Sequence, residues 1–357
     1  MTDIPAFLKK LISTSGLSGY ETPIRETISE TWRGLSDELS ASQLGSLHAL
    51  KRGAGPAPRP SILIATHMDA IGLMVTRIVD GFLHVTEIGG IDARVLPGQP
   101  VIVHGREDIP GMVVQPPSWL LPPDNDSGPV ELGNLLVDTG LPGGRVSQLI
   151  RLGDLVSFGT QPVELGKNFI SGHSLDNRAS VAALTRCLDD LQTRHHKWDV
   201  WAVATSQEEE TLGGAATSAF QLAPQLAVAV DVTFGKGPGS PAEKTFEMGG
   251  GPVLGWGANV HPGVHKAFKE AAERLEMTTQ LEAMPRHSGT DAYSMQVAAA
   301  GIPTMVLSIP LRYMHTPVEV VHLKDIHRVG RLLAEFITGL ADDFMEKLSW
   351  DGEESKE

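Results

Sequence analysis

Short apolar runs alternate along the chain with stretches in which apolar residues recur every three or four positions. The runs at 61–66, 226–230 and 302–309 have the length and content of strands that are buried in a parallel sheet. The helical spacing covers 179–191, 263–275, 290–299 and 323–340. Strands that alternate with helices predict an α/β domain with a mostly parallel sheet flanked by helices.

A further helix is predicted near the N-terminus. Ile24, Ile28 and Trp32 recur at every fourth position and form one apolar face. Thr22 followed by Pro23 predicts the start of this helix, with Thr22 as its N-cap.

The stretch 71–165 has a different character. It is rich in Gly and Pro, contains short β-like runs at 81–86, 100–104 and 134–138, and lacks a convincing amphipathic helix. We predict a small β-barrel-like domain, 71–165, inserted into an α/β domain formed by 1–70 and 166–357. Loop-forming residues are dense at 115–130, which predicts a mobile loop there.

Composition excludes several classes of protein. The 357 residues carry a net charge of −14, and no stripe of Lys and Arg is present to bind the phosphates of a nucleic acid. No segment has the roughly 18 uninterrupted apolar residues of a membrane span. The first ten residues lack a secretory signal, and the single Cys187 lies at helical spacing among leucines, typical of a buried thiol. These features predict a cytoplasmic protein, whose acidic residues 350–357 form a frayed tail.

The first chemical signal is a triplet of carboxylates. A strand-like run at 198–206 leads through Gln207 into Glu208, Glu209 and Glu210, and a break at Gly213 and Gly214 follows. Three adjacent carboxylates repel one another unless cations or protons hold some of them. Ligands of open α/β sheets bind beyond the carboxyl ends of such strands, so the triplet lies where a site is expected.

Five residues at or just beyond predicted element ends are candidate metal ligands: His67, Asp176, Glu209, Asp231 and His315. Imidazole and carboxylate suit divalent zinc, cobalt or manganese, and the set suffices for two ions if one carboxylate bridges them. Taken singly, each of these residues could also have an ordinary structural role. Asp176, for example, is also suited to a turn or to the N-cap of the helix at 179–191.

Two carboxylates near these ligands have predicted supporting roles. Asp69 follows His67 by two residues and is expected to orient its imidazole. Glu208 is expected to act as general base, since adjacent residues in an extended segment or tight turn point in different directions. Glu210 is expected to be solvated or structural.

Seven segments, in order along nearly the whole chain, resemble the tetrahedral aminopeptidases, a family also known as glutamyl aminopeptidase or cellulase M. They are Thr66-His67-Met68-Asp69-Ala70-Ile71-Gly72, Gly89-Gly90 through Pro97-Gly98, Ser174-Leu175-Asp176-Asn177-Arg178-Ala179, Gln207-Glu208-Glu209, Ala229-Val230-Asp231-Val232-Thr233, Gly289-Thr290-Asp291-Ala292, and the stretch from Ile309-Pro310 to Val318-Glu319 that contains His315.

The resemblance implies a dinuclear site and a known assembly. Asp176 would bridge two ions, His67 and Asp231 would complete one of them, and Glu209 and His315 the other, with zinc expected first and cobalt or manganese as alternatives. It also implies a cis peptide after Asp176, a PDZ-like dimerisation domain in the insert, and dimers that build a tetrahedral dodecamer.

Two positions depart from the family pattern. Glu210 and Thr211 replace a small apolar residue and a glycine, and Gly213 stands where the family often has Arg. Both changes bear on specificity, so no substrate preference is carried over. His287 is expected either to face the cavity or to serve as a surface or capping residue.

The expected function is a metal-dependent aminopeptidase acting on peptides with a free N-terminus. A metal-dependent amidohydrolase or deacylase of small N-acyl compounds would use the same chemistry. A glycosidase, as some relatives are named, needs two carboxyls but no histidine-containing metal set. A non-catalytic relative would be expected to have lost ligands, whereas this chain keeps all five.

Overall fold

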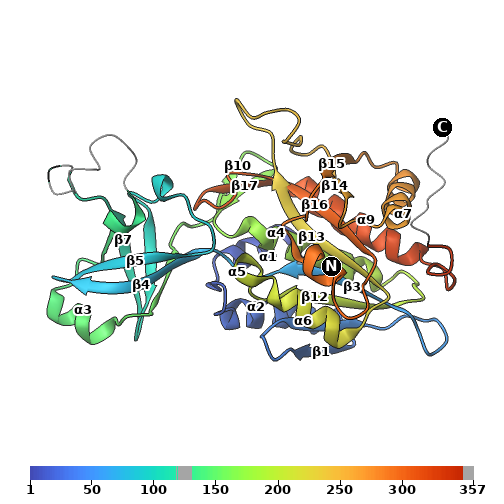
Figure 1. Cartoon of the computed structure of the whole chain (residues 1–357), viewed down its shortest axis with the longest axis horizontal. Coiled ribbons are helices and arrows are strands. Elements are labelled where there is room, and N and C mark those ends of the chain that lie inside the picture. The colour runs from blue at the N-terminus through green and yellow to red at the C-terminus, as the bar shows by residue number, and fades with distance from the viewer. Residues whose placement is uncertain (118, 120–130, 349–357) are drawn as a thin grey trace.

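The computed structural model describes residues 1–117, 119 and 131–348. They form a large sheet covered by helices and a separate closed barrel at one end of the molecule (Figure 1). The chain enters the barrel after β3 (Ser61–His67) and leaves it after β9 (Leu155–Phe158). Each part has its own cluster of buried apolar side chains. We therefore propose that the barrel is an inserted unit, with the chain returning to the large sheet before β10 (Val163–Leu165).

The large sheet is mixed. Its strands run in the order β1 (Glu38–Ala41), β2 (Leu47–Lys51), β12 (Asp199–Thr205), β3, β13 (Leu226–Phe234), β16 (Thr304–Arg312), β17 (Glu319–His322), β11 (Phe169–Gly172) and β10, with β14 (Val253–Gly257) and β15 (Gln280–Met284) joined to β16.

The α/β prediction is confirmed, but parallel pairing is confined to part of the sheet. The pairs β12–β3, β3–β13, β13–β16 and β14–β15 are parallel, and every other pair of the large sheet is antiparallel. At the two ends of the strand order, β1–β2 and β10–β11 are consecutive segments that join as antiparallel hairpins. Helices lie between the strands of the parallel pairs, as parallel crossovers require.

Where a helix was predicted, its bounds differ mainly at the ends, whereas the helices at 143–149, 208–211 and 213–222 were not predicted. The helices are α1 (Ile4–Ile12), α2 (Thr22–Trp32), α3 (Gly143–Leu149), α4 (Leu175–Leu191), α5 (Glu208–Thr211), α6 (Gly213–Leu222), α7 (Pro262–Arg274), α8 (Asp291–Gln296) and α9 (Leu323–Gly339). Thr22 is the first residue of α2, and Glu21 is its N-cap, without a side-chain hydrogen bond. The prediction of Thr22 as the N-cap is therefore wrong by one residue.

The longest central helix, α4, lies against β3 and β13 and packs on α1 and α9. Small side chains such as Ala179, Ala182 and Ala183 are fully buried on it, and they allow this close approach. Cys187 on the same helix is buried, as predicted, and burial raises the pKa of its thiol. In the described residues, no helix is long and apolar enough to cross a membrane.

The barrel is closed by six antiparallel strands. Their order is β4 (Gly72–Val79), β5 (Phe82–Ile88), β8 (Leu136–Asp138), β7 (Asp108–Val114), β6 (Pro100–His104) and β9. The three β-like runs of the sequence correspond to β5, β6 and β8. The short helix α3 was not expected, since seven residues with one buried side chain give little periodic signal. Most of the loop predicted at 115–130, and the tail at 350–357, lie outside the described residues.

Candidate metal centre

The parallel strands at the centre of the sheet bring the first two site residues together. Ala229 of β13 lies opposite Ala65 of β3. Two residues further along each strand, Asp231 comes level with His67. Asp231 lies within β13, not after it as expected, because pairing with β16 continues this strand to Phe234.

The acidic triplet lies on α5, a single helical turn, and not on an extended segment. The carboxylate of Asp69 accepts hydrogen bonds from the main-chain N–H groups of Glu208 and Glu209, at 3.0 and 3.1 Å. The first N–H groups of a helix have no partner within it, so a carboxylate placed there satisfies them. Asp69 thus holds the backbone from which the side chains of Glu208 and Glu209 diverge.

Asp69 also lies beside the imidazole that it was expected to orient. The Nδ1 atom of His67 is 3.3 Å from the carbonyl oxygen of Asp69 and 3.5 Å from its carboxylate. Both residues are buried. The carbonyl oxygen of Asp69 is thus nearer to the His67 ring than its carboxylate is, and the carboxylate accepts hydrogen bonds from α5.

Asp176 lies between the two candidate histidines. Its Oδ1 atom is 3.1 Å from His67 Nε2, and its Oδ2 atom is 3.4 Å from His315 Nε2. On the His315 side, Glu209 Oε2 is 3.4 Å from the same Nε2 atom. On the His67 side, Asp231 Oδ1 and Glu208 Oε2 are each 3.7 Å from Nε2. All five predicted ligands therefore converge, and Glu208 joins them.

These separations fit ligands that share a cation. Two ligand atoms bound tetrahedrally to zinc at about 2.0–2.1 Å lie roughly 3.3 Å apart, close to the distances around His67 and His315. Among the described residues, two groups have ligand atoms within 4.8 Å of one another, one formed by His67, Glu208 and Asp231 and one by His67, Asp176 and Glu209. The residues present therefore fit divalent metal ions.

The electrostatics of the cluster also call for positive charge. Burial, reinforced by neighbouring acids, raises the pKa of Glu208 to about 10 and that of Asp231 to about 8. Burial and the charge of Asp176 likewise raise the pKa of Glu209, whose Oε1 atom is buried without a hydrogen-bond partner. Carboxylates placed in this way are stabilised as anions only if cations lie among them.

Glu319 is a functional candidate to which the sequence analysis assigned no role. It is buried at the start of β17 and accepts hydrogen bonds from the main-chain N–H groups of Asp176 and His315, at 3.1 and 2.9 Å. It therefore fixes the backbone of two candidate ligands from different elements. The available signal was an acid directly followed by Val320 and Val321, in a strand that is wholly buried.

Several residues beside or within the site have left-handed backbone conformations, among them Ser174, Gln207 and His315, with φ angles of 60, 57 and 61°. Such conformations are unfavourable for residues with a Cβ atom and persist where surrounding contacts enforce them, often at functional sites. The peptide bond between Asp176 and Asn177 is cis, as the resemblance implies.

The cluster opens into a cavity of about 500 Å³. His287 lines this cavity, with its ring centroid 5.5 Å from that of Tyr293. Glu210 is exposed and does not line it; its carboxylate accepts a hydrogen bond of 2.6 Å from the N–H of Gly89, beyond the end of β5. The carboxylate of Glu210 therefore stabilises the segment that follows β5.

A cavity in which imidazoles and carboxylates converge at the strand ends of an α/β sheet is typical of metal-dependent hydrolases. The chain belongs to the M42 peptidases: the family model described as M42 glutamyl aminopeptidase matches residues 45–332. Members of this family are hydrolases that act on peptides, and membership implies divalent metal ions.

Individual relatives agree over nearly the full length. The lysyl aminopeptidase of Pyrococcus furiosus is 33% identical over 331 residues, which cover 91% of this chain and 94% of that one. A TET aminopeptidase from a marine sediment archaeon of the Thaumarchaeota is 28% identical with a TM-score of 0.91, over 98% of this chain and 100% of that one. The TET1 peptidase of Pyrococcus horikoshii is 28% identical with a TM-score of 0.83, over 95% and 100%.

Proposed function

We propose that this aminopeptidase removes N-terminal residues from peptides with two divalent cations held by His67, Asp176, Glu209, Asp231 and His315. The observation that carries the proposal is the position of Asp176, whose two oxygens face two different histidines at 3.1 and 3.4 Å. A carboxylate in this position can bridge two ions.

The ligand count supports the same assignment. His67, Asp231 and one oxygen of Asp176 would hold one ion, and His315, Glu209 and the other oxygen would hold the second. Three protein ligands for each ion leave a position for water or substrate, as in catalytic zinc sites. Zinc is the expected metal, and cobalt and manganese accept the same ligand types.

Glu208 is assigned as the general base and not as a ligand. Its Oε2 atom is as close to His67 Nε2 as Asp231 is, at 3.7 Å, so distance alone allows either role. As an additional ligand it would close the open position and leave no base. When bound, the two cations would acidify water and polarise the scissile carbonyl. Glu208 would accept the proton of the attacking water and return it to the departing amine.

The surroundings of the site suit a substrate with a free α-amino group. Among the described residues, the cavity is lined by carboxylates and by no Lys or Arg. A cleft lined by one sign of charge attracts ligands of the opposite sign. This lining favours a peptide N-terminus over the N-acyl substrates of an amidohydrolase, and a glycosidase would not need the two histidines.

The test compares free and N-acetylated aminoacyl p-nitroanilides on chelated protein resupplied with zinc, cobalt or manganese. We expect activity on the free amines only, two ions bound per chain, and no activity without metal. Glu208→Gln should keep both ions and lose about 10²- to 10⁴-fold in kcat, whereas Glu210→Gln, a matched change on the same turn, should stay near the wild-type rate. Near-native turnover by Glu208→Gln with both ions present would show that the base is wrong. Activity on the acetylated substrates alone would favour the amidohydrolase.

The chain is also proposed to form a homo-oligomer in the cytoplasm. The TET1 peptidase of Pyrococcus horikoshii assembles into a tetrahedron or a large octahedral shell. Exposed apolar side chains on the barrel, including Val79, Phe82 and Met112, support an interface there. A dimer through the barrel that builds a tetrahedral dodecamer is the proposed assembly.

A further inference from the structure

One carboxylate of the cavity takes no part in the metal cluster. Glu282 lies on the edge strand β15 and lines the cavity. Its Oε1 atom accepts a hydrogen bond of 3.0 Å from the hydroxyl of Thr233. Its Oε2 atom is buried and has no hydrogen-bond partner. A buried polar atom without a partner is costly, so one left at a cavity wall points to a ligand group.

The strand geometry sets the distance of Glu282 from the proposed reaction centre. Thr233 follows Asp231 by two residues on β13, so their side chains project from the same face, roughly 7 Å apart. The carboxylate of Glu282 contacts the far member of this pair. A substrate group bound there would be separated from the cluster by about the length of a long side chain.

The walls around Glu282 suit an alkyl chain that ends in a cation. Met284 follows Glu282 by two residues on β15 and also lines the cavity, which offers apolar surface to methylene groups. No Lys or Arg of the described residues lines the cavity, and none forms an ion pair with Glu282. No Lys or Arg of the described residues therefore pairs with the unsatisfied oxygen, and a cation on the ligand would satisfy it.

We propose that Glu282 recognises the side-chain cation of an N-terminal lysine or arginine, so that this chain prefers basic N-terminal residues. The proposal rests on the proposed function, because it assumes that the N-terminal residue is held at the metal cluster. Lysine places its ammonium on a flexible four-carbon stem and arginine its guanidinium on a similar one, and both donate to carboxylates.

A structural role for Glu282 makes a different prediction. If Glu282 served only to tie β15 to β13 through Thr233, the carboxylate would be replaceable by any acceptor of the same shape. Glu282→Gln keeps the shape and an oxygen that accepts from Thr233, but it removes the charge. This substitution therefore separates recognition of a cation from support of the strand.

The experiment uses a pair of substrates that differ in one charge. Lysyl and norleucyl p-nitroanilide have side chains of similar length, and only lysine carries the ammonium. On the metal-loaded wild type we expect lysyl kcat/KM to exceed norleucyl kcat/KM by at least about tenfold. In Glu282→Gln, lysyl kcat/KM should fall by about 30-fold, the size of one charge-assisted hydrogen bond, and norleucyl kcat/KM by less than about threefold.

Binding and a control variant complete the design. Calorimetry with free L-lysine and L-norleucine should show the same loss of lysine affinity in Glu282→Gln. Glu273→Gln, an exposed glutamate on α7, makes the same change in net charge and should alter neither substrate. Equal losses of activity on both substrates in Glu282→Gln, or a wild type that prefers norleucine, would overturn the proposal. Turnover of norleucyl p-nitroanilide would in either case still support the aminopeptidase function. A metal-loaded wild type that cleaves neither substrate, nor any other free aminoacyl anilide, would overturn both.

Discussion

The buried carboxylates of this site differ in the direction of their pKa shifts, because they have different neighbours. Burial alone would raise the pKa of Asp176, but hydrogen bonds from His315 and His67 hold it below the usual range. Glu208 and Asp231 lie 3.7 Å from His67 Nε2, too far for a hydrogen bond, and burial among other acids raises their pKa. The proposed bridge is therefore the carboxylate of the cluster that stays ionised most readily without metal.

His173, on the segment that leads into α4, allows the effect of burial on a histidine pKa to be tested. Burial, and then the charge of Arg178, lower the pKa of His173 to about 3, whereas histidine in an unfolded chain titrates near 6.5. The unfolded state thus binds more protons below about pH 6.5, so the stability present above that pH is lost as the pH falls toward 3.

We therefore expect the metal-free wild type to lose stability relative to His173→Gln as the pH falls from about 6 to 4. The difference in unfolding free energy should change by up to about 1.4 kcal/mol per pH unit, measured by urea titration at several pH values. His195→Gln, a change at an exposed histidine, provides the control. Parallel pH profiles for the wild type and His173→Gln would contradict the assignment.

At the scale of elements, the junction between α5 and α6 positions the acidic turn. The N–H of Gly214 donates to the carbonyl of Ser206 at the end of β12, which anchors α6 beside the strand. The break predicted at Gly213 and Gly214 is thus a tight junction between two helices, made by a left-handed Leu212. Glycine permits the close approach, since a Cβ atom on Gly214 would lie 2.2 Å from the Ser206 oxygen.

Gly214→Ala should therefore destabilise the protein by about 1–3 kcal/mol through overpacking against main-chain atoms. It should also lower kcat, because α6 can relieve the clash only by moving away from β12, together with α5. Denaturant unfolding and aminoacyl anilide turnover measure the two effects. Gly144→Ala, in α3 with no atom near the added methyl group, should be neutral or slightly stabilising. A Gly214→Ala protein as stable and active as the wild type would rule out this account of the junction.

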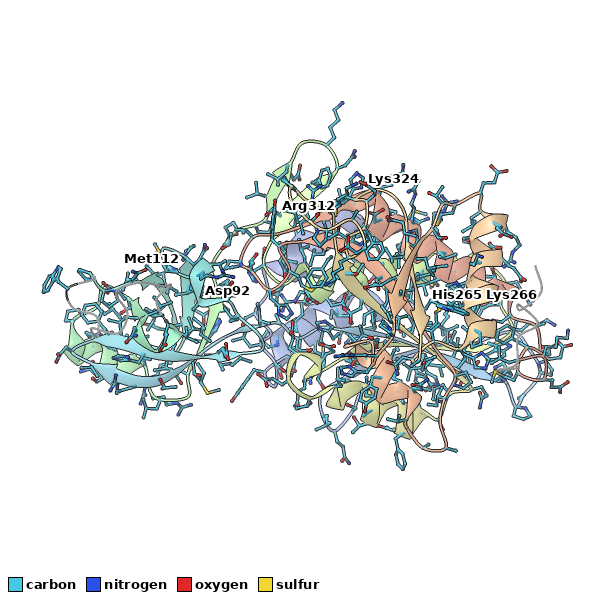
Figure 2. All side chains as sticks on the ribbon, turned by 45° about the horizontal axis from the view of Figure 1, so that its top comes forward. Asp92, Met112, His265, Lys266, Arg312 and Lys324 are labelled. Carbon is cyan, nitrogen blue, oxygen red and sulfur yellow. The ribbon has the colours of Figure 1, made fainter. Side chains whose placement is uncertain are left out.

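At the scale of the whole molecule, the barrel projects from the α/β unit and is not covered by it. It lies at one end, and Met112 is on its surface, far from the labelled residues of the sheet and helices such as His265 (Figure 2). Phe82 and Met112 are 39% and 42% exposed, although both are large apolar residues. Burying such side chains between subunits would favour association.

Light scattering of the wild type should give a multiple of the 38.2 kDa chain mass. Phe82→Glu combined with Met112→Glu should lower that mass while preserving the fold, because it places charges in the proposed interface. Phe220→Glu, at an exposed phenylalanine of α6 outside the barrel, should leave the mass unchanged. A monomeric wild type at micromolar concentration would contradict the proposed assembly.

Local patterns were enough to predict the central strands, the helices α4, α7 and α9, the β-rich insert and the set of converging ligands. Apolar runs and helical spacing depend on neighbours in the chain, and ligand types at strand ends are visible without coordinates. The sheet edges, the short helix α3 and the helical form of the acidic turn were not predicted. The helical form of the acidic turn depends on a distant residue, because Asp69 caps α5 from 139 residues away. The helix α3 has one buried side chain and so gives little periodic signal.

The sequence by itself determined which side chains can bind metal and at the ends of which strands they lie. Only the tertiary structure decided that the two oxygens of Asp176 face different histidines, that Glu319 anchors Asp176 and His315, and that Glu282 meets Thr233 across 49 residues of sequence. The physical reason is that register between distant strands is set by the packing of the whole sheet, which no local pattern contains.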